Sequence, residues 1–598
     1  MAVALLLPVL RSGYILRYDM LFVPRRPLSL SLLGISERLP RQVPIDALVA
    51  LGSWAVPADW LEKFLLAGII VLGAVGAGRL VPSRRLGPSV VAGLFYVWNP
   101  FVYERLSIGH WSLLLSYAAL PWVAIAALTV RDHEDTDGIT RWARLGLWLG
   151  AASVANPYGG IIAMVLAFAV IAGPPWRRGW AVSARSMVAV IGLAVIVSLP
   201  WLAPAFLRSE PFPNSLQGLR AFAPRSDSPL GTVGSVLSLG GMWNTSLAPS
   251  IRHGWGWVPG FALVLFGSVV GWRWLRRARP AMAGVLVAGV LGAVMGLGAR
   301  LPLLGGVYRW IALNAPGGAL LRDSQKFMGL LSLAYAEGLG SALLAWTGTP
   351  SPLEVQGEPV GGPGPSKSGP GWMRSLLPFA FTLLVVSLLP TMAWGLGGRL
   401  STVAYPSDWR AARATTMEDP SPGAILSLPW HPHLPISWNR GTTTLNPASA
   451  FFARRTVTSD RLELRSGTLP AESEHGRQAD GLVRSDLPLS VVMRRTGARY
   501  LVLLKEADWR RYRGRVTGLE RVLDGRTVAL YRLRGTVDRV PSTAPSSSGV
   551  IAADVLALAG FMLMGAALRG RQCENGVPSR GPMAGAPDIL HAHEGGGP

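Results

Sequence analysis

Residues 87–130 read GPSVVAGLFYVWNPFVYERLSIGHWSLLLSYAALPWVAIAALTV, two apolar runs on either side of one polar turn. A helix needs about 20 largely apolar residues to cross a bilayer, and residues 111–130 meet this requirement. The turn between the runs carries Glu104, Arg105 and His110. The stretch therefore predicts two membrane-spanning helices whose connecting turn presents ionisable groups at the membrane face.

The same alternation of apolar runs and short polar turns continues along the whole chain of 598 residues. Half of the residues are apolar and only 15% are charged, whereas a soluble domain has about 25% charged residues. The composition thus predicts an α-helical integral membrane protein, with about 12 transmembrane helices. The expected spans have approximate cores at 1–16, 64–78, 87–98, 111–130, 143–155, 159–173, 186–206, 257–271, 281–298, 327–346, 375–394 and 549–568.

Arginine clusters follow every second span. They are Arg79, Arg84 and Arg85; Arg131, Arg141 and Arg144; Arg177, Arg178 and Arg185; and Arg273, Arg276, Arg277 and Arg279. Basic residues concentrate in short cytoplasmic loops, so we expect both termini in the cytoplasm. We attribute the net charge of +23 partly to these topology signals and expect no nucleic-acid partner.

The spans and loops divide the chain into parts of different character. They are a polytopic membrane domain over 1–394 with a long first extracytoplasmic loop over 17–63, a disordered cytoplasmic linker over 347–373, an extracytoplasmic domain over 395–547, a last span over 548–568 and a disordered cytoplasmic tail over 569–598. The linker and tail are rich in Gly and Pro, which is typical of disorder.

The segment 395–547 shows alternating signals for strands and helices. Ala424–Pro429, Tyr500–Leu504 and Val528–Leu533 read as strands, and Leu487–Thr496 reads as a helix that Gly497 ends. We therefore expect a small α/β domain immediately before the last span.

Polar residues, most of them ionisable, cluster at the outer ends of the spans, and ionisable residues are almost absent from the span interiors. The clusters are Arg17 and Asp19; Glu104, Arg105 and His110; and Arg322, Asp323, Gln325 and Lys326. Ion-coupled transporters usually carry acids or bases near the bilayer centre, so this pattern weakens a transporter reading.

Mixed acids and bases at the membrane face suit a site for a lipid-borne phosphate, because the planar fork of arginine binds phosphate in a bidentate manner. We expect Arg105, Arg322 and Lys326 to converge on one phosphate, supported by Glu104, His110 and Asp323.

An acid must also take a proton from the attacking acceptor hydroxyl. Asp19 is the leading candidate because it follows the first predicted span directly. The alternative for Asp19 is a structural role, as a partner of Arg17 or a helix cap, with Asp46, Glu104 or Asp323 then serving as the base.

Four features resemble the GT-C superfamily of polytopic glycosyltransferases, in particular its actinobacterial arabinofuranosyl- and mannosyltransferases. They are Asp19 followed by a long loop, the segments Trp98–Arg105 and Gly109–Trp111, the segment Leu321–Phe327, and an outer domain that opens with Tyr405-Pro406-Ser407-Asp408-Trp409. Many members have an acidic pair where this chain has Asp19 alone.

The resemblance implies a plasma-membrane enzyme with a polyprenyl-phosphate-sugar donor and an envelope glycan or glycolipid acceptor. Transfer would invert the anomeric centre. The resemblance leaves open whether a divalent cation binds at the donor phosphate, and the sequence indicates no metal-binding residue for it.

Two other functions fit the same pattern. A carrier or flippase for lipid-linked saccharides would share the spans and basic residues but would not need Asp19 as a base. A non-catalytic envelope-assembly protein would use the membrane domain to present the segment 395–547 to partners.

The pair His431 and His433 flanks Pro432 and fits aromatic packing in a loop better than a metal site.

Overall fold

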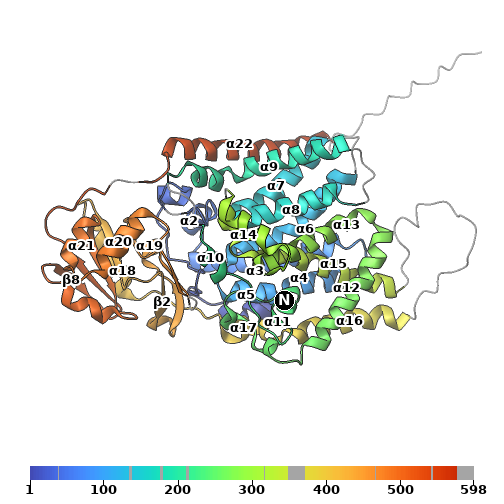
Figure 1. Ribbon diagram of the computed structural model, residues 1–598, viewed down its shortest axis with the longest axis horizontal. Coiled ribbons are helices and arrows are strands. Elements are labelled where there is room, and N and C mark those ends of the chain that lie inside the picture. Colours follow the sequence, from blue (N-terminus) through green and yellow to red (C-terminus); the bar gives the residue numbers. More distant parts are fainter. Residues whose placement is uncertain are drawn as a thin grey trace, which may run out of the picture.

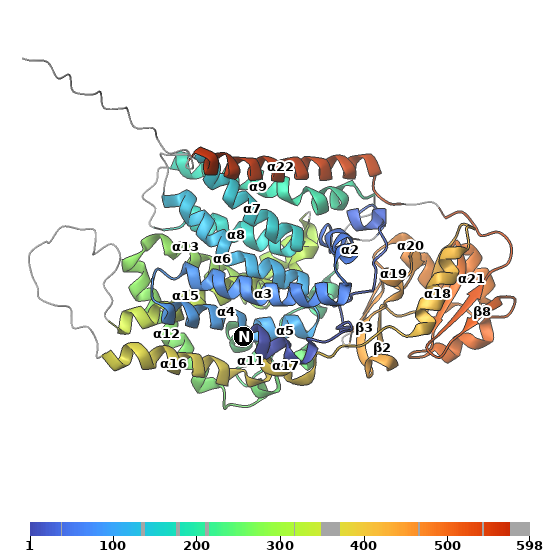
Figure 2. The ribbon, with the colours of Figure 1, turned by 180° about the vertical axis from the view of Figure 1, so that it is seen from behind.

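The computed structural model describes the chain except for residues 38, 133–137, 175–179, 210–213, 316, 348–370, 465–466, 541–542 and 575–598. A bundle of long helices forms most of the molecule, and a smaller domain containing β-strands sits at one end of it (Figure 1). The view from behind shows the same arrangement (Figure 2). The predicted linker over 347–373 and tail over 569–598 lie mostly outside the described residues.

The bundle is built from long helices with shorter ones at their ends. The long helices are α3 (Ala58–Leu80), α4 (Leu86–Val97), α6 (Trp111–Asp132), α7 (Gly138–Ala155), α8 (Pro157–Ala172), α9 (Trp180–Leu207), α12 (Val258–Ala278), α13 (Ala283–Leu297), α15 (Met328–Trp346), α16 (Gly371–Leu388) and α22 (Ser547–Glu574). The shorter helices are α1 (Ala2–Leu6), α2 (Ile45–Ala55), α5 (Pro100–Ser107), α10 (Leu216–Ala221), α11 (Gly231–Leu237), α14 (Gly305–Asn314) and α17 (Ala393–Gly398), with 3₁₀ turns that include η1 (Leu7–Val9), η2 (Leu30–Leu33), η7 (Gly318–Leu321) and η8 (Ser324–Phe327).

Among the described helices, 7 are long and apolar enough to cross a membrane, or up to 8 if the bent pair at Pro390 is one span. The two parts of that pair meet at 74°. The chain is thus a mostly helical protein with several candidate spans, and the expected number of about 12 is not confirmed. Two glutamates, Glu62 in α3 and Glu337 in α15, are fully buried within candidate spans, so the span interiors are less free of acids than we expected.

The prediction of a first span over residues 1–16 was wrong. Within this stretch only residues 2–9 are helical, as α1 and η1, and Tyr14 already pairs with Val403 in a β-bridge. Leu5, Leu6 and Val9 are buried where α1 packs against α3 and α17. The apolar run is therefore too short to cross a bilayer and instead fills space inside the bundle, so the cytoplasmic placement of the N-terminus loses its basis.

The domain at the end of the bundle, here called the sheet domain, has a five-stranded sheet in the order β4-β1-β7-β9-β8. The strands are β1 (Ala424–Leu428), β4 (Thr456–Val457), β7 (Ala498–Leu504), β8 (Glu520–Asp524) and β9 (Val528–Arg532). Strand β1 pairs in parallel with β4 and β7, while β9 is antiparallel to both β7 and β8. The strands predicted at β1, β7 and β9 are confirmed.

Helices cover both faces of this sheet. Side chains along each strand alternate between the two faces, so alternate residues of β7 contact different helices. Tyr500, Val502 and Leu504 pack with α18 (Ser407–Glu418) and α19 (Ala448–Phe451). The alternate residues of β7 pack with α20 (Glu474–Arg484) and α21 (Leu489–Arg495). The predicted small α/β domain is therefore confirmed, as is the helix ended by Gly497, whose φ is +67°.

Two antiparallel hairpins extend from the sheet domain toward the bundle. They are β2 (His433–Ile436) with β3 (Thr442–Leu445), and β5 (Leu462–Leu464) with β6 (Gly467–Leu469). The first hairpin touches the N-terminal segment, and the second packs Leu469 against Phe222 of the bundle. The space between the two domains holds the candidate site.

Candidate functional site

An extended N-terminal segment joins the bundle to the sheet domain. Its backbone pairs with the start of the sheet domain at Tyr14 and Val403 (N–O 2.8 and 3.0 Å). It then forms a tight turn over Arg17–Met20, in which the backbone amide of each end donates to the carbonyl of the other (3.0 and 2.8 Å). Asp19 stands at the tip of this turn.

Both domains hold the turn that carries Asp19. From the bundle side, the Asp19 amide donates to the Ile108 carbonyl at 3.1 Å. From the sheet-domain side, the Tyr18 amide donates to Thr443 and the Leu445 amide donates to Tyr18, each at 2.8 Å. Asp19 is thus fixed where the bundle and the β2–β3 hairpin meet.

The corner between α5 and α6 is shaped to receive this turn. Asn99 caps α5 by accepting a hydrogen bond from the Val102 amide at 3.1 Å. Gly109 then turns the chain with φ +81°, and a Cβ there would lie 2.2 Å from the Met20 nitrogen. Only glycine allows the corner to approach the turn so closely, and this approach brings His110 beside Asp19.

The carboxylate of Asp19 lies between two histidines. Its Oδ2 is 3.2 Å from Nε2 of His110, and its Oδ1 is 3.0 Å from Nε2 of His433. Burial would raise the pKa of Asp19, but the hydrogen bonds from His110 and His433 outweigh burial and hold the pKa well below its usual range. Asp19 is therefore an anion at neutral pH.

His110 is held as a neutral hydrogen-bond donor. Nη1 of Arg105 lies 3.2 Å from its Nδ1, and because arginine only donates, Nδ1 accepts and the ring proton resides on Nε2, facing Asp19. Burial lowers the pKa of His110, and the positive charges of Lys326 and Arg105 act in the same direction.

Arg105 is fully buried and ties this corner to the loop before α15. Its guanidinium lies 3.2 Å from Asp323 Oδ2 and also bonds Gln325. Lys326 shares the same Asp323 oxygen at 3.3 Å, and its ammonium lies 3.7 Å from the centre of the Tyr158 ring. The structure thus brings together Arg105, His110, Asp323 and Lys326, but Arg105 is not among the residues that line the cavity.

Glu104 lies in a different environment. It is fully buried beside Asp227 and Arg252, and these two residues form a bidentate ion pair at 2.8 and 2.9 Å. Burial, followed by the charge of Asp227, raises the pKa of Glu104 well above its usual range. Glu104 therefore lies inside the bundle beside the Asp227–Arg252 ion pair, and it is not among the residues that line the cavity.

Arg322 faces the cavity, and no described residue forms an ion pair with it. Its guanidinium stacks 4.6 Å from the centre of the Phe222 ring, and its buried Nε–H finds no hydrogen-bond acceptor among the residues that the structure describes. A second guanidinium, that of Arg41, lies near enough to lower the pKa of Arg322, although burial is the larger cause. Arg41 itself pairs with Glu472 across the two domains.

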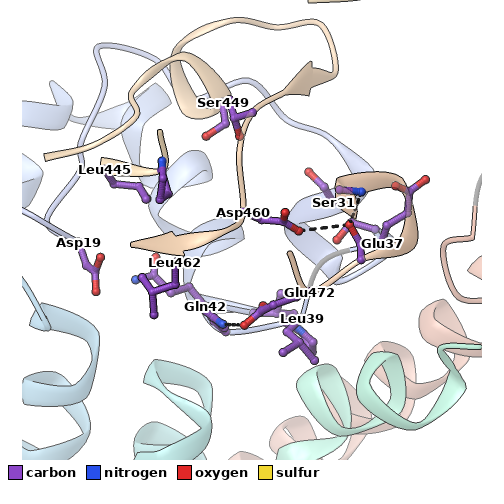
Figure 3. A pocket seen from close by; sticks show the side chains of 18 of the residues that line it. Asp19, Ser31, Glu37, Leu39, Gln42, Leu445, Ser449, Asp460, Leu462 and Glu472 are labelled. Atoms are coloured by element: carbon purple, nitrogen blue, oxygen red, sulfur yellow. Dashed lines mark hydrogen bonds and ion pairs between the residues drawn. The ribbon is translucent and has the colours of Figure 1, made fainter. Parts of the chain in front are cut away.

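These groups line one cavity of about 2050 Å³ between the bundle and the sheet domain. Asp19, His110, His433, Arg41, Arg322, Asp323 and Lys326 all lie on its wall. Figure 3 shows Asp19 on one side, with Asp460 and Ser449 of the sheet domain and Glu37 and Gln42 of the first loop around the same space. Apolar side chains of α9, among them Trp201, Leu202 and Phe206, line another part.

Sequence reasoning missed His433 and Arg41 as members of this site. His433 lies 414 residues from Asp19, and only the pairing of the β2–β3 hairpin with Tyr18 reveals the contact. Arg41 carried no signal beyond its place in the first loop. Of the pair expected to fit aromatic packing, His433 does lie beside an aromatic ring, that of Tyr18 with 6.3 Å between the ring centres. His431 instead bonds Glu463 and Asp508 at 2.7 and 3.1 Å.

Among the described residues, no group of three or more His, Cys, Asp or Glu side chains is arranged to hold a metal ion. Neither a family model nor a curated protein matches the chain.

Solved structures do share its fold. The cryo-EM structure of the arabinofuranosyltransferase AftD from Mycobacteria superposes with a TM-score of 0.56 at 17% identity, and covers 90% of this chain and 40% of that one. A mutant of AftD gives a TM-score of 0.55 at 18% identity, with 90% and 41% covered. This chain spans less than half the length of AftD, and identity this low carries the fold alone. The fold of this protein is similar to that of the arabinofuranosyltransferase AftD.

Proposed function

We propose that this protein is a membrane glycosyltransferase that moves a sugar from a polyprenyl-phosphate donor to an envelope glycan or a lipid-linked acceptor. One observation carries the proposal: the carboxylate of Asp19, the cation of Arg41 and the cations of Arg322 and Lys326, from three distant parts of the chain, line a single cavity at the end of a membrane helix bundle. The AftD-like fold supports the same class of reaction.

The donor phosphate would bind at Arg322, Lys326 and Arg41. Burying a cation without a partner is costly, and Arg322 has no ion-pair partner among the described residues, so an anionic ligand supplies the missing charge. Lys326 and Arg41 each already have one acid partner, Asp323 and Glu472, and can share a phosphate as further donors. Arg105 would act from behind by holding Asp323 and His110 in place.

The lipid tail and the acceptor would occupy other parts of the same cavity. Trp201, Leu202 and Phe206 of the span α9 offer an apolar wall for the polyprenyl chain. The wall formed by the first loop and the sheet domain carries many hydroxyl, amide and carboxylate groups, including Ser449 and Gln42 (Figure 3). Such groups suit the hydroxyls of a glycan. Pockets for drug-sized ligands hold about 300–1,000 Å³, and this cavity is large enough for two substrates.

In the proposed reaction the acceptor hydroxyl attacks the anomeric carbon of the donor sugar. The new glycosidic C–O bond forms while the bond from that carbon to the phosphate oxygen breaks, and the configuration inverts. Asp19 takes the hydroxyl proton, and Arg322 and Lys326 stabilise the negative charge on the departing polyprenyl phosphate.

A reconstituted transfer assay tests the proposal. Purified protein in proteoliposomes is given a radiolabelled polyprenyl-phosphate sugar, first with arabinofuranose and then with mannose, together with an oligosaccharide acceptor. We expect the label to appear in a longer, water-soluble oligosaccharide. Movement of labelled lipid between leaflets without any transfer would instead assign the protein as a carrier.

A further inference from the structure

The two histidines beside Asp19 come from different domains and are held differently. His110 belongs to the bundle, and Arg105 fixes its ring from the far side. His433 belongs to β2 of the sheet domain, and its second ring nitrogen has no hydrogen-bond partner among the residues that the structure describes. The orientation of His433 therefore depends on the hairpin backbone, on Asp19 and on the neighbouring Tyr18 ring, whose centre lies 6.3 Å away.

The hairpin that carries His433 is docked on the N-terminal segment at several points. Besides the two backbone bonds to Tyr18, the Asn439 side chain donates to the Leu16 carbonyl at 2.7 Å. Outside the hairpin, Tyr405 of the same domain donates its hydroxyl to the Phe22 carbonyl at 3.0 Å. The distance from His433 to Asp19 is thus fixed by the way in which the sheet domain sits on the bundle.

We propose that His433 is a positioning residue of the reaction centre, through which the docked sheet domain orients the Asp19 carboxylate and keeps it charged. A carboxylate only accepts hydrogen bonds, so Nε2 of His433 donates to Oδ1 while Nε2 of His110 donates to Oδ2. These two hydrogen bonds fix the orientation of the Asp19 carboxylate. A remaining lone pair on one of its oxygens can then accept the proton of the acceptor hydroxyl. The inference rests on the proposed function for its kinetic test and on the structure alone for its stability test.

Several charged groups besides His433 act on the Asp19 carboxylate, and they limit how far one substitution can shift its pKa. His110 faces it from the α5–α6 corner, with Arg105 and Lys326 behind. Arg41 acts from the first loop, and Arg17 in the same turn directs its guanidinium to the Ser107 and Arg399 carbonyls. Loss of His433 removes one of two direct donors and leaves the others in place.

The kinetic test is the pH profile of kcat/KM for His433→Phe. Without this donor the pKa of Asp19 rises toward its ordinary value, so the acid limb of the profile should move to higher pH by about one unit or more. His433→Gln retains an N–H donor and should restore most of the wild-type profile. His431→Phe, two residues away and not in contact with Asp19, is the matched control and should leave the limb unmoved. An acid limb of His433→Phe that coincides with that of the control would overturn the proposal.

The stability test does not need activity. At pH 7 the decreases in Tm from His433→Phe and Asp19→Asn should be non-additive, because both changes break the same bond. The depressed pKa of Asp19 contributes stability above the ordinary aspartate pKa, and that contribution is lost as the pH falls below it, so the coupling should shrink toward pH 3. Additive decreases at pH 7 would overturn the proposal even if the protein has no transferase activity. If the wild-type protein shows no transfer but the two Tm decreases are non-additive, the proposed function is refuted and the contact between His433 and Asp19 is confirmed.

Discussion

Asp19 owes its environment to residues that the sequence places both near it and very far from it. The sequence suggested that Asp19 lies near His110, but through a first span that the structure does not contain: Asp19 stands in a turn, and only His110 adjoins the end of a long helix. Its bond to His433 could not be predicted, because no pattern in one chain indicates which hairpin of a folded domain meets a turn 414 residues earlier. The same limit hid Arg41, whereas the grouping of Asp323 with Lys326 follows from their spacing along one turn.

Arg322 gives the most direct prediction about the donor. Arg322→Ala removes the cation that lacks a partner among the described residues, and hydrogen bonds to charged groups contribute about 1.5–3 kcal/mol. The affinity for polyprenyl phosphate in nanodiscs, measured by the ligand-induced rise in Tm, should therefore fall about 10- to 100-fold. Arg309→Ala, on the exposed face of α14, is the control. Equal affinity in the two variants would make Arg322 an ordinary interfacial anchor.

The elements of the bundle were predicted well wherever an apolar run was long enough to stand alone. Helices α6, α12, α13 and α15 cover the expected spans, and α7 and α8 turn at Asn156 and Pro157 as expected. Residues 1–16 were predicted wrongly because hydropathy does not distinguish the start of a span from a short helix buried by its neighbours. The corner between α5 and α6 depends on a backbone approach at Gly109 that composition cannot reveal.

Gly109→Ala tests that corner. The added Cβ would lie 2.2 Å from the Met20 nitrogen and 2.5 Å from the Arg17 carbonyl oxygen, at a φ of +81°. Left-handed backbone at a residue other than glycine costs about 1–3 kcal/mol, and the clash with the turn adds to this. We expect a lower Tm and loss of transfer, because the corner and the Asp19 turn must separate.

Gly306→Ala is the matched control for this change. Gly306 lies in α14, and a Cβ there meets no atom within 4 Å, so its Tm should be unchanged or slightly raised. A Gly109→Ala protein with the Tm and activity of this control would show that the turn does not depend on the close approach.

At the scale of the whole molecule, the site lies at the opposite end of the bundle from Arg131 and Arg279. Helix α6 begins beside His110 and ends near Arg131, and the Arg279–Asp132 ion pair at 3.4 Å joins this end to the end of α12. A helix rises about 1.5 Å per residue, so the 22 residues of α6 separate the two ends by roughly the thickness of a bilayer core. Basic loops favour the cytoplasm, which places the sheet domain and the cavity on the outer face as a prediction.

Cysteine labelling on intact cells tests this orientation in a Cys573→Ser background. Thr517→Cys on the exposed surface of the sheet domain should react with an impermeant maleimide. Ser83→Cys, between α3 and α4 beside Arg84 and Arg85, should react only after the cells are permeabilised. The reverse labelling pattern would show the opposite orientation, with the sheet domain and the cavity on the cytoplasmic face.

The central claim is that Asp19 is the base of a glycosyl transfer, and turnover of Asp19→Asn by the purified protein tests it most directly. The change keeps the shape of the side chain and removes its charge. Loss of a general base typically lowers the rate by 10²–10⁴, so transfer should fall by that factor while binding of polyprenyl phosphate stays the same. Asp508→Asn, on the sheet-domain surface where it pairs with Arg511, should transfer like the wild type. Transfer by Asp19→Asn at close to the wild-type rate would contradict the account and leave Asp19 as a structural link between the two domains.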